Sequence, residues 1–249
     1  MPKRAHNALG KAGRGWGGGA EGIRLPKRAL KGLTAERRQR IPSVSTAPDT
    51  RPGALGWTPM DLVTDELPDI PADIVLAELR AYLADAADLE IQELPTRCSP
   101  WVVRDVTAHL AATFTRFNQM LAQSRAGDLT PPFEPRGLSD ENLARVADFT
   151  GDPLAALERE ALAFIAEATN PDEMIAHQFG PLPMRVQMGF ALNELAIHHD
   201  DLAHACRRTY EPPLATQALL AKAWDRLGGL PIEEPGDTDW SRVLRASGR

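Results

Sequence analysis

The chain has 249 residues and a formal net charge of -6, and its 43% hydrophobic and 25% charged content is ordinary for a globular protein. Its two cysteines, Cys98 and Cys206, are too few for a secreted disulfide scaffold or a four-thiolate zinc site, which indicates a reducing compartment. No apolar run is long enough for a membrane helix, and the apolar block of a secretory signal is missing. We therefore expect a cytoplasmic protein that does not enter the membrane.

Charge is divided unevenly along the chain. Residues 1–59 hold 12 basic and 3 acidic side chains and 10 of the 19 glycines, whereas residues 60–249 hold 16 basic and 31 acidic side chains. The first segment has no sustained apolar period, so we expect it to be disordered and the second segment to form the folded domain. A basic arm can hold nucleic acid through phosphate contacts. The alternative, which we favour, is a reading frame begun too far upstream, with Met60 as the biological start.

A glycine motif in the first segment has a weak claim to function. Gly13, Gly15 and Gly18 satisfy the GxGxxG spacing of dinucleotide-binding folds. That site needs a strand before the motif and a helix after it, and the local pattern indicates neither. We therefore expect no dinucleotide site.

Apolar residues recur at spacings of three and four along the acidic segment, which predicts helices. Ser99 and Asp152 are expected N-caps, each followed by a proline at the first helical position. The four main helices are expected over residues 71–90, 100–127, 153–170 and 184–208. Shorter helices are expected over residues 139–150 and 214–227, with an irregular tail anchored by Trp240 and Leu244. The pattern predicts an all-α four-helix bundle with a short C-terminal helical extension.

The fourth main helix carries several metal-competent side chains in the stretch FALNELAIHHDDLAHAC. Glu194 and His198 are four residues apart, roughly 6 Å at Cβ, on one edge of the apolar stripe. A carboxylate and an imidazole so placed can share a divalent cation. Two interpretations remain open, half of a metal site or a surface polar row. Asp200 and His204 form a second such pair that points to the far side, where we expect both to be solvated.

Two other histidines belong to apolar stripes. His199 is expected to be a core histidine hydrogen-bonded to backbone, in preference to a ligand. His109, at the margin of the stripe of the second main helix, is expected to be a packing residue unless a partner helix brings ligands to it. Axes of facing helices lie about 8–10 Å apart, so His109 with Glu194 and His198 would supply three ligands and leave a coordination position open.

Two motifs carry a resemblance to a known family. CSPWVVRDVTAHLA (98–111) and ELAIHHDDLAHA (194–205) resemble segments of the mycothiol-dependent maleylpyruvate isomerase family, a branch of the DinB-like four-helix bundles. The closing LRASGR is also similar to endings found in this group. The chain departs from the pattern at Val102, where the family has threonine, and at His199 and Asp200, where it has glycine and tryptophan.

The resemblance implies that His109, Glu194 and His198 bind a divalent cation, usually zinc, and that Asp201 is an acceptor orienting an imidazole. It also implies mycothiol as the thiol cosubstrate. In the isomerase reaction the thiol adds to a cis double bond, the new single bond rotates, and elimination releases the trans product; other relatives transfer the thiol to an electrophile. A catalytic cysteine is not needed for this chemistry.

We expect Cys98 and Cys206 to be packing residues, because no basic group is evidently placed to activate either thiol. Two other functions remain open, a non-catalytic metal-binding bundle and a metal-dependent hydrolase in which water occupies the open position.

Overall fold

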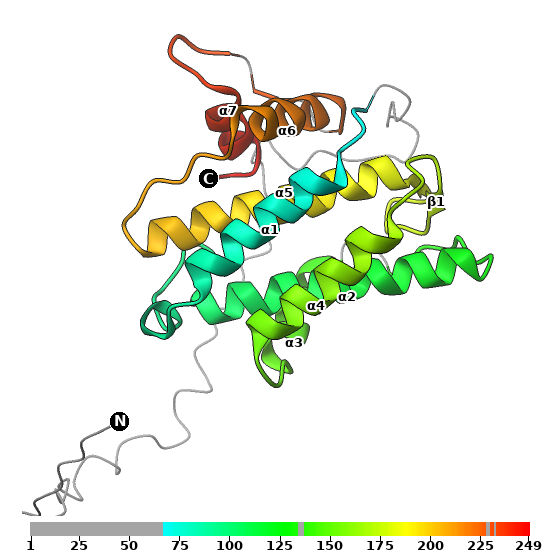
Figure 1. Ribbon diagram of the computed structural model, residues 1–249, viewed down its shortest axis with the longest axis horizontal. Helices are drawn as coiled ribbons and strands as arrows, with labels where there is room; N and C mark the ends of the chain where they lie inside the picture. Colours follow the sequence, from blue (N-terminus) through cyan, green and yellow to red (C-terminus); the bar gives the residue numbers. More distant parts are fainter. Residues whose placement is uncertain (1–66, 134–136, 228–229, 232) are drawn as a thin grey trace, which may run out of the picture. The chain divides into compact units, whose positions relative to one another are not determined.

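The computed structural model describes residues 67–133, 137–227, 230–231 and 233–249 (Figure 1). The predictions for residues 1–59, including disorder, the glycine motif and a start at Met60, lie outside these residues. The described chain is almost entirely helical, and the prediction of an all-α bundle is confirmed. Its four main helices are α1 (Ala72–Ala86), α2 (Val103–Arg125), α4 (Pro153–Glu167) and α5 (Met184–Ala205).

Aromatic rings pack α2 against α4. Phe114 and Phe117 of α2 lie with ring centroids 6.0 and 5.4 Å from the ring of Phe164 on α4, and all three are buried. Inclined rings at this separation add to the apolar burial that drives the packing. On the other side of the bundle, α1 packs against α5. These contacts fix α2 and α5, the two helices that carry the predicted ligands.

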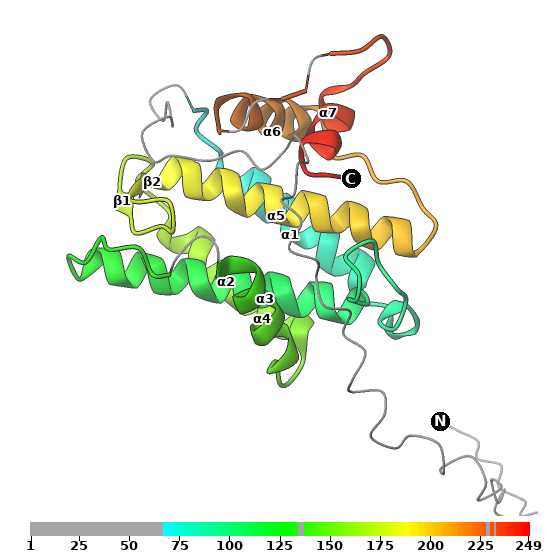
Figure 2. The same ribbon diagram turned by 180° about the vertical axis from the view of Figure 1, so that it is seen from behind.

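α2 and α5 run in opposite directions, as Figure 2 shows. His109, near the start of α2, contacts Glu194 at the middle of α5. At the other end of α2, the hydroxyl of Ser124 accepts a hydrogen bond of 2.7 Å from the N–H of Ala176, eight residues before α5 begins. Residues later in α2 therefore lie beside residues that come earlier in α5 or before it.

A small hairpin precedes α5 and was not predicted. Strand β1 (Met174–Ile175) pairs antiparallel with β2 (Leu182–Pro183) in a two-stranded sheet. Each strand has two residues, too few to show the alternating pattern by which strands are recognised.

The predicted start of the second helix is wrong. α2 begins at Val103, and Ser99–Pro100, joined by a cis peptide bond, lies in the preceding turn. This turn is closed by a 2.9 Å hydrogen bond from the N–H of Trp101 to the carbonyl of Cys98. In place of the expected cap, the N–H groups of Val103 and Arg104 at the start of α2 donate to the carbonyls of Leu94 and Gln92, each at 3.0 Å. The Asp152 cap is confirmed, because its carboxylate accepts from the N–H of Leu154 at 2.9 Å and Pro153 is the first helical residue of α4.

The other helices differ from prediction mainly at their ends. The first helix stops at Ala86, and a separate 3-10 turn, η4, covers Leu89–Ile91. The short helix α3 spans Leu138–Ala147 and α6 spans Leu214–Leu227, as predicted for the latter.

The expectation of an irregular tail is wrong. Residues Asp239–Ala246 form helix α7, in which the hydroxyl of Thr238 caps the N–H of Ser241 at 3.1 Å. Trp240 is buried and its indole N–H donates to the carbonyl of Tyr210 at 3.2 Å, which anchors the tail as expected. Among the described helices, none combines the length and the apolar character needed to cross a membrane.

Candidate metal centre

α2 and α5 bring three metal-competent side chains together. Nε2 of His109 lies 3.2 Å from Oε2 of Glu194, and Nε2 of His198 lies 3.6 Å from the same oxygen. One ligand atom from each of the three residues lies within 4.8 Å of the others. The two imidazole rings are edge-on, with centroids 5.0 Å apart. The two helices thus present two nitrogens and one oxygen to a common point.

These separations fit a single small cation. Donor atoms bound tetrahedrally to zinc at about 2.0–2.2 Å lie roughly 3.3–3.6 Å from one another. The measured distances of 3.2 and 3.6 Å match this spacing without a change of helix position. The side chains of His109 and His198 are 7% and 9% exposed, whereas that of Glu194 is 31% exposed. The carboxylate therefore marks the side from which solvent reaches the cluster.

The three residues hold one another electrostatically. Burial disfavours the Glu194 carboxylate, but the hydrogen bond from His109 and the nearby positive charges outweigh it and lower the Glu194 pKa to about 2. Burial lowers the pKa of His109. For His198, burial is outweighed by hydrogen bonds to Asp201 and Cys98 and by the Glu194 charge, which raise its pKa to about 9. Without a cation, His198 is therefore protonated at pH 7, and metal binding must release that proton.

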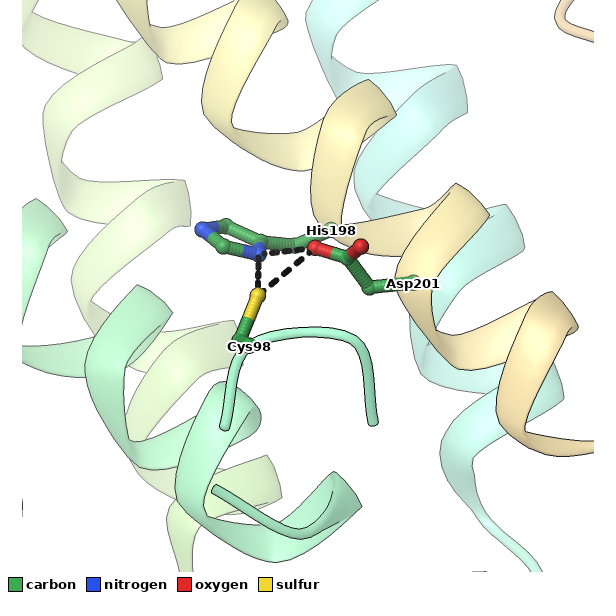
Figure 3. Close-up of side chains that lie close together, drawn as sticks. All are labelled: Cys98, His198 and Asp201. Atoms are coloured by element: carbon green, nitrogen blue, oxygen red, sulfur yellow. Dashed lines mark hydrogen bonds and ion pairs between the residues drawn. The ribbon is translucent and has the colours of Figure 1, made fainter. Parts of the chain in front are cut away.

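The second nitrogen of His198 faces a different set of groups. Figure 3 shows Nδ1 directed toward Asp201 and Cys98, while the other ring nitrogen points away from them. Nδ1 lies 2.9 Å from Oδ2 of Asp201 and 3.8 Å from Sγ of Cys98. Because the Asp201 side chain is fully buried, this bond is shielded from competing water. The hydrogen bond to Asp201 holds the ring so that Nε2 faces Glu194 and His109, and the Nε2 proton must leave before a cation can bind there.

The expectation that Cys98 is only a packing residue with no basic group nearby is wrong. Its thiol donates to Oδ2 of Asp201 at 3.0 Å and lies 3.3 Å from Nη2 of Arg249. Arg249 also donates to both Asp201 oxygens, at 2.9 and 2.8 Å. Arg97 adds a contact of 3.3 Å to the same carboxylate. Burial opposes ionisation of Asp201, but His198 and Arg249 outweigh it and hold its pKa well below the usual range.

The sequence profile of the mycothiol maleylpyruvate isomerase N-terminal domain family matches residues 72–203, more than half of the chain. The chain belongs to this family. The matched segment contains His109, Glu194, His198 and Asp201, whereas Arg249 lies beyond it. Neither the curated proteins nor the solved structures gave a match.

His199 and Asp200, where the chain departs from the family pattern, are both structural. His199 is buried, as expected, but its nitrogens face the carboxylates of Glu78 at 2.8 Å and Asp85 at 3.2 Å instead of backbone. The expectation that Asp200 is solvated is wrong, because it is buried and paired with Arg97. The guanidinium of Arg97 offsets the cost of burying this carboxylate. His204, by contrast, is exposed, as expected. Cys206 is half-buried at the end of α5.

Trp101, part of the family motif, packs against His109 of the candidate metal centre. Its ring lies with its centroid 5.0 Å from that of His109. Trp101 also lines a cleft of about 700 Å³ beside α3, whose lining residues are Glu93, Pro100, Trp101, Val102, Arg104, Asp105, Ala108, Leu143, Val146, Ala147 and Phe149. The three candidate ligands do not line this cleft. Trp101 therefore separates His109 from a cavity large enough for a small organic molecule.

Proposed function

We propose that the protein is a metal-dependent enzyme that uses mycothiol to isomerise a cis double bond or to transfer the thiol to a small electrophile. The observation that carries this proposal is the convergence of His109, Glu194 and His198 at donor spacings that suit one cation. Membership of a family named for a mycothiol-dependent isomerase supports the choice of thiol.

The donor set favours zinc with one position open. Two imidazole nitrogens and one carboxylate oxygen are common zinc ligands, and three protein ligands are typical of catalytic sites. When bound, the cation supplies Lewis acidity that favours the thiolate form of a thiol in the open position. The exposed part of Glu194 lies where such a thiol would arrive from solvent.

The residues around the ligands hold them in the binding arrangement. Asp201 accepts a hydrogen bond from Nδ1–H of His198 and so favours the tautomer whose Nε2 can bind a cation. His198 and Arg249 keep Asp201 ionised, and Arg97 contacts the same carboxylate. Trp101 packs on the ring of His109 and restricts its rotation. Each of these contacts lowers the cost of ordering the site when the cation and the thiol bind.

In the proposed isomerisation the thiolate sulfur forms a bond to one alkene carbon, and the π electrons move onto an adjacent carbonyl. The former double bond is now single and rotates. The electrons then return, the carbon–sulfur bond breaks, and the trans alkene and the thiolate are released. In a transfer reaction the adduct instead takes up a proton at carbon and is released.

The test is turnover of an electrophile panel by zinc-loaded protein with and without mycothiol. His198→Ala should abolish thiol-dependent turnover, and removal of zinc by a chelator should do the same. His204→Ala is the matched control, because His204 is an exposed histidine of the same helix. Hydrolysis that needs no thiol would favour the metal-hydrolase alternative. Firm metal binding without turnover of any electrophile would favour a non-catalytic bundle.

A further inference from the structure

Two buried polar side chains continue the metal-binding faces of α2 and α5 away from the cluster. Arg116 follows His109 by seven residues in α2, and Gln187 precedes Glu194 by seven residues in α5. Seven residues are close to two helical turns, so each side chain is on the same helix face as its ligand. Because the two helices are antiparallel, both positions are displaced in the same direction, by roughly 10 Å along the bundle.

Gln187 is a buried amide that the protein leaves unpaired. The residue is 0% exposed, and neither its amide nitrogen nor its amide oxygen has a hydrogen-bond partner among the described residues. Buried polar side chains in folded proteins nearly always have partners, since leaving one unpaired is costly. A leucine or methionine would fill an apolar position of α5 without that cost. The amide therefore indicates a group that binds beside it.

Arg116 is a buried cation without a counter-charge in contact. The residue is 7% exposed, and its guanidinium donates to Oδ1 of Asn142 at 2.9 Å and faces the ring of Phe133 at 5.5 Å. Across the described part of the chain the guanidinium forms no ion pair, and the carboxylates of Glu194 and Glu141 act on it only from longer range. Buried charges are normally paired. A planar guanidinium in this state suits a carboxylate, which it can bind through two parallel hydrogen bonds.

The wall between these positions is aromatic and carries no charge. The ring of His177 stacks on that of Phe190, three residues after Gln187, with centroids 5.1 Å apart and an interplanar angle of 4°. Burial, together with the positive charge of Arg116, lowers the pKa of His177 to about 3, so the ring is neutral at pH 7. Arg145 also acts on Arg116 electrostatically, but Arg145 pairs with Glu141 at 2.7 Å, so Arg116 offers the charge for a carboxylate ligand.

We propose that Arg116 and Gln187 form a subsite for a carboxylate group of the electrophile that reacts at the metal centre. The guanidinium binds the carboxylate, and the amide N–H of Gln187 donates to it. The subsite rests on the proposed function, since its ligand is the electrophile of that reaction. The helix register places the subsite two turns from the candidate metal ligands. It would select electrophiles that carry a carboxylate near the reacting double bond, and would hold the molecule by the end that does not react.

The test measures binding without thiol and without turnover. Zinc-loaded protein is titrated by calorimetry with succinate and with its neutral diamide, in the native chain and in Arg116→Gln, Gln187→Met and Arg125→Gln. Arg125 is the matched control, because it is a more exposed arginine of the same helix that already pairs with Glu167 and Glu173. Loss of a charge-assisted hydrogen bond should weaken succinate binding by roughly tenfold or more in Arg116→Gln, and leave the diamide unaffected.

Gln187→Met separates a binding role from a structural one. If the amide serves the ligand, the variant should bind succinate several-fold more weakly and unfold at a higher temperature, since an unpaired buried amide has been removed. A lower unfolding temperature with unchanged affinity would show that the amide serves the fold, for instance through a buried water, and would overturn the proposal. Equal succinate affinity in Arg116→Gln and Arg125→Gln would overturn it as well. Arg116-dependent binding without thiol-dependent turnover would retain the subsite and refute only the reaction.

Discussion

Replacing Asp201 with asparagine tests how His198 is held for metal binding. In the native protein Oδ2 of Asp201 lies 2.9 Å from Nδ1 of His198 and 2.8 Å from Nη2 of Arg249. Asparagine keeps the size of the side chain but removes its charge and offers only one oxygen. Its amide nitrogen would face donors that it cannot accept from. The imidazole is then no longer fixed in the orientation and tautomer that turn Nε2 toward the other two candidate ligands.

The expected loss follows from the removal of one orienting partner. Removing the acceptor behind a metal-binding histidine typically weakens metal affinity by about 10–100-fold, equal to roughly 1.4–2.7 kcal/mol. The metal-free protein should lose about 2–3 kcal/mol of unfolding free energy, less than the full value for a broken buried pair. The discount arises because the side chains of Arg97 and Arg249 are 30% and 21% exposed and can be hydrated.

The assay is zinc affinity by competition with a chromophoric chelator, together with urea unfolding of the metal-free protein. Asp200→Asn is the control, since Asp200 is the neighbouring buried carboxylate and also pairs with Arg97. It should leave zinc affinity within about twofold, because Asp200 pairs with Arg97 and does not orient His198. Equal zinc affinity in the two variants would refute the role given to Asp201.

Three further variants test other parts of the structure. Phe164→Ala should lower the unfolding free energy in urea by about 3–5 kcal/mol, because it opens a cavity beside two aromatic rings of α2. Arg249→Ala should weaken zinc binding in the chelator assay, by less than Asp201→Asn does, because Arg249 acts indirectly, through its contacts with Asp201 and Cys98. His177→Phe should flatten the acid side of the stability profile. Native His177 stays neutral until about pH 3, whereas the unfolded chain takes up the proton below 6.5. The contribution of His177 to the unfolding free energy is therefore fully present above pH 6.5. It falls by about 1.4 kcal/mol per pH unit as the pH drops below that value. A slope in urea titrations between pH 6.5 and 5 that is unchanged in His177→Phe would contradict this.

Local signals predicted the helices well, and non-local contacts explain the misses. Asp152 with Pro153 marked a helix start because the cap is made within three residues of sequence. Ser99 with Pro100 carried the same signal, but the hydrogen bond between Trp101 and Cys98 turns the chain there. Helix α7 has only eight residues, too few to show a helical period, and depends on the burial of Trp240.

The residues of the candidate site also fall into those that local sequence patterns predict and those that only non-local contacts bring together. The four-residue spacing of Glu194 and His198 could be read from one helix, and the motif around His109 supplied the third member. The contact of Cys98 with Asp201 spans 103 residues and that of Arg249 with Asp201 spans 48, so no spacing rule connects them. Arg116 and Gln187 were open to prediction, because each repeats the face of a candidate ligand after seven residues.

Packing and chemistry occupy different faces of α2. Phe114 and Phe117 point toward α4, and His109 points toward α5. Exchanging residues on the face of α5 that carries Gln187 should therefore leave the aromatic contacts between α2 and α4 intact. Substitutions on that face of α5, made by design or by evolution, could change which substrate binds while the packing of the bundle stays the same.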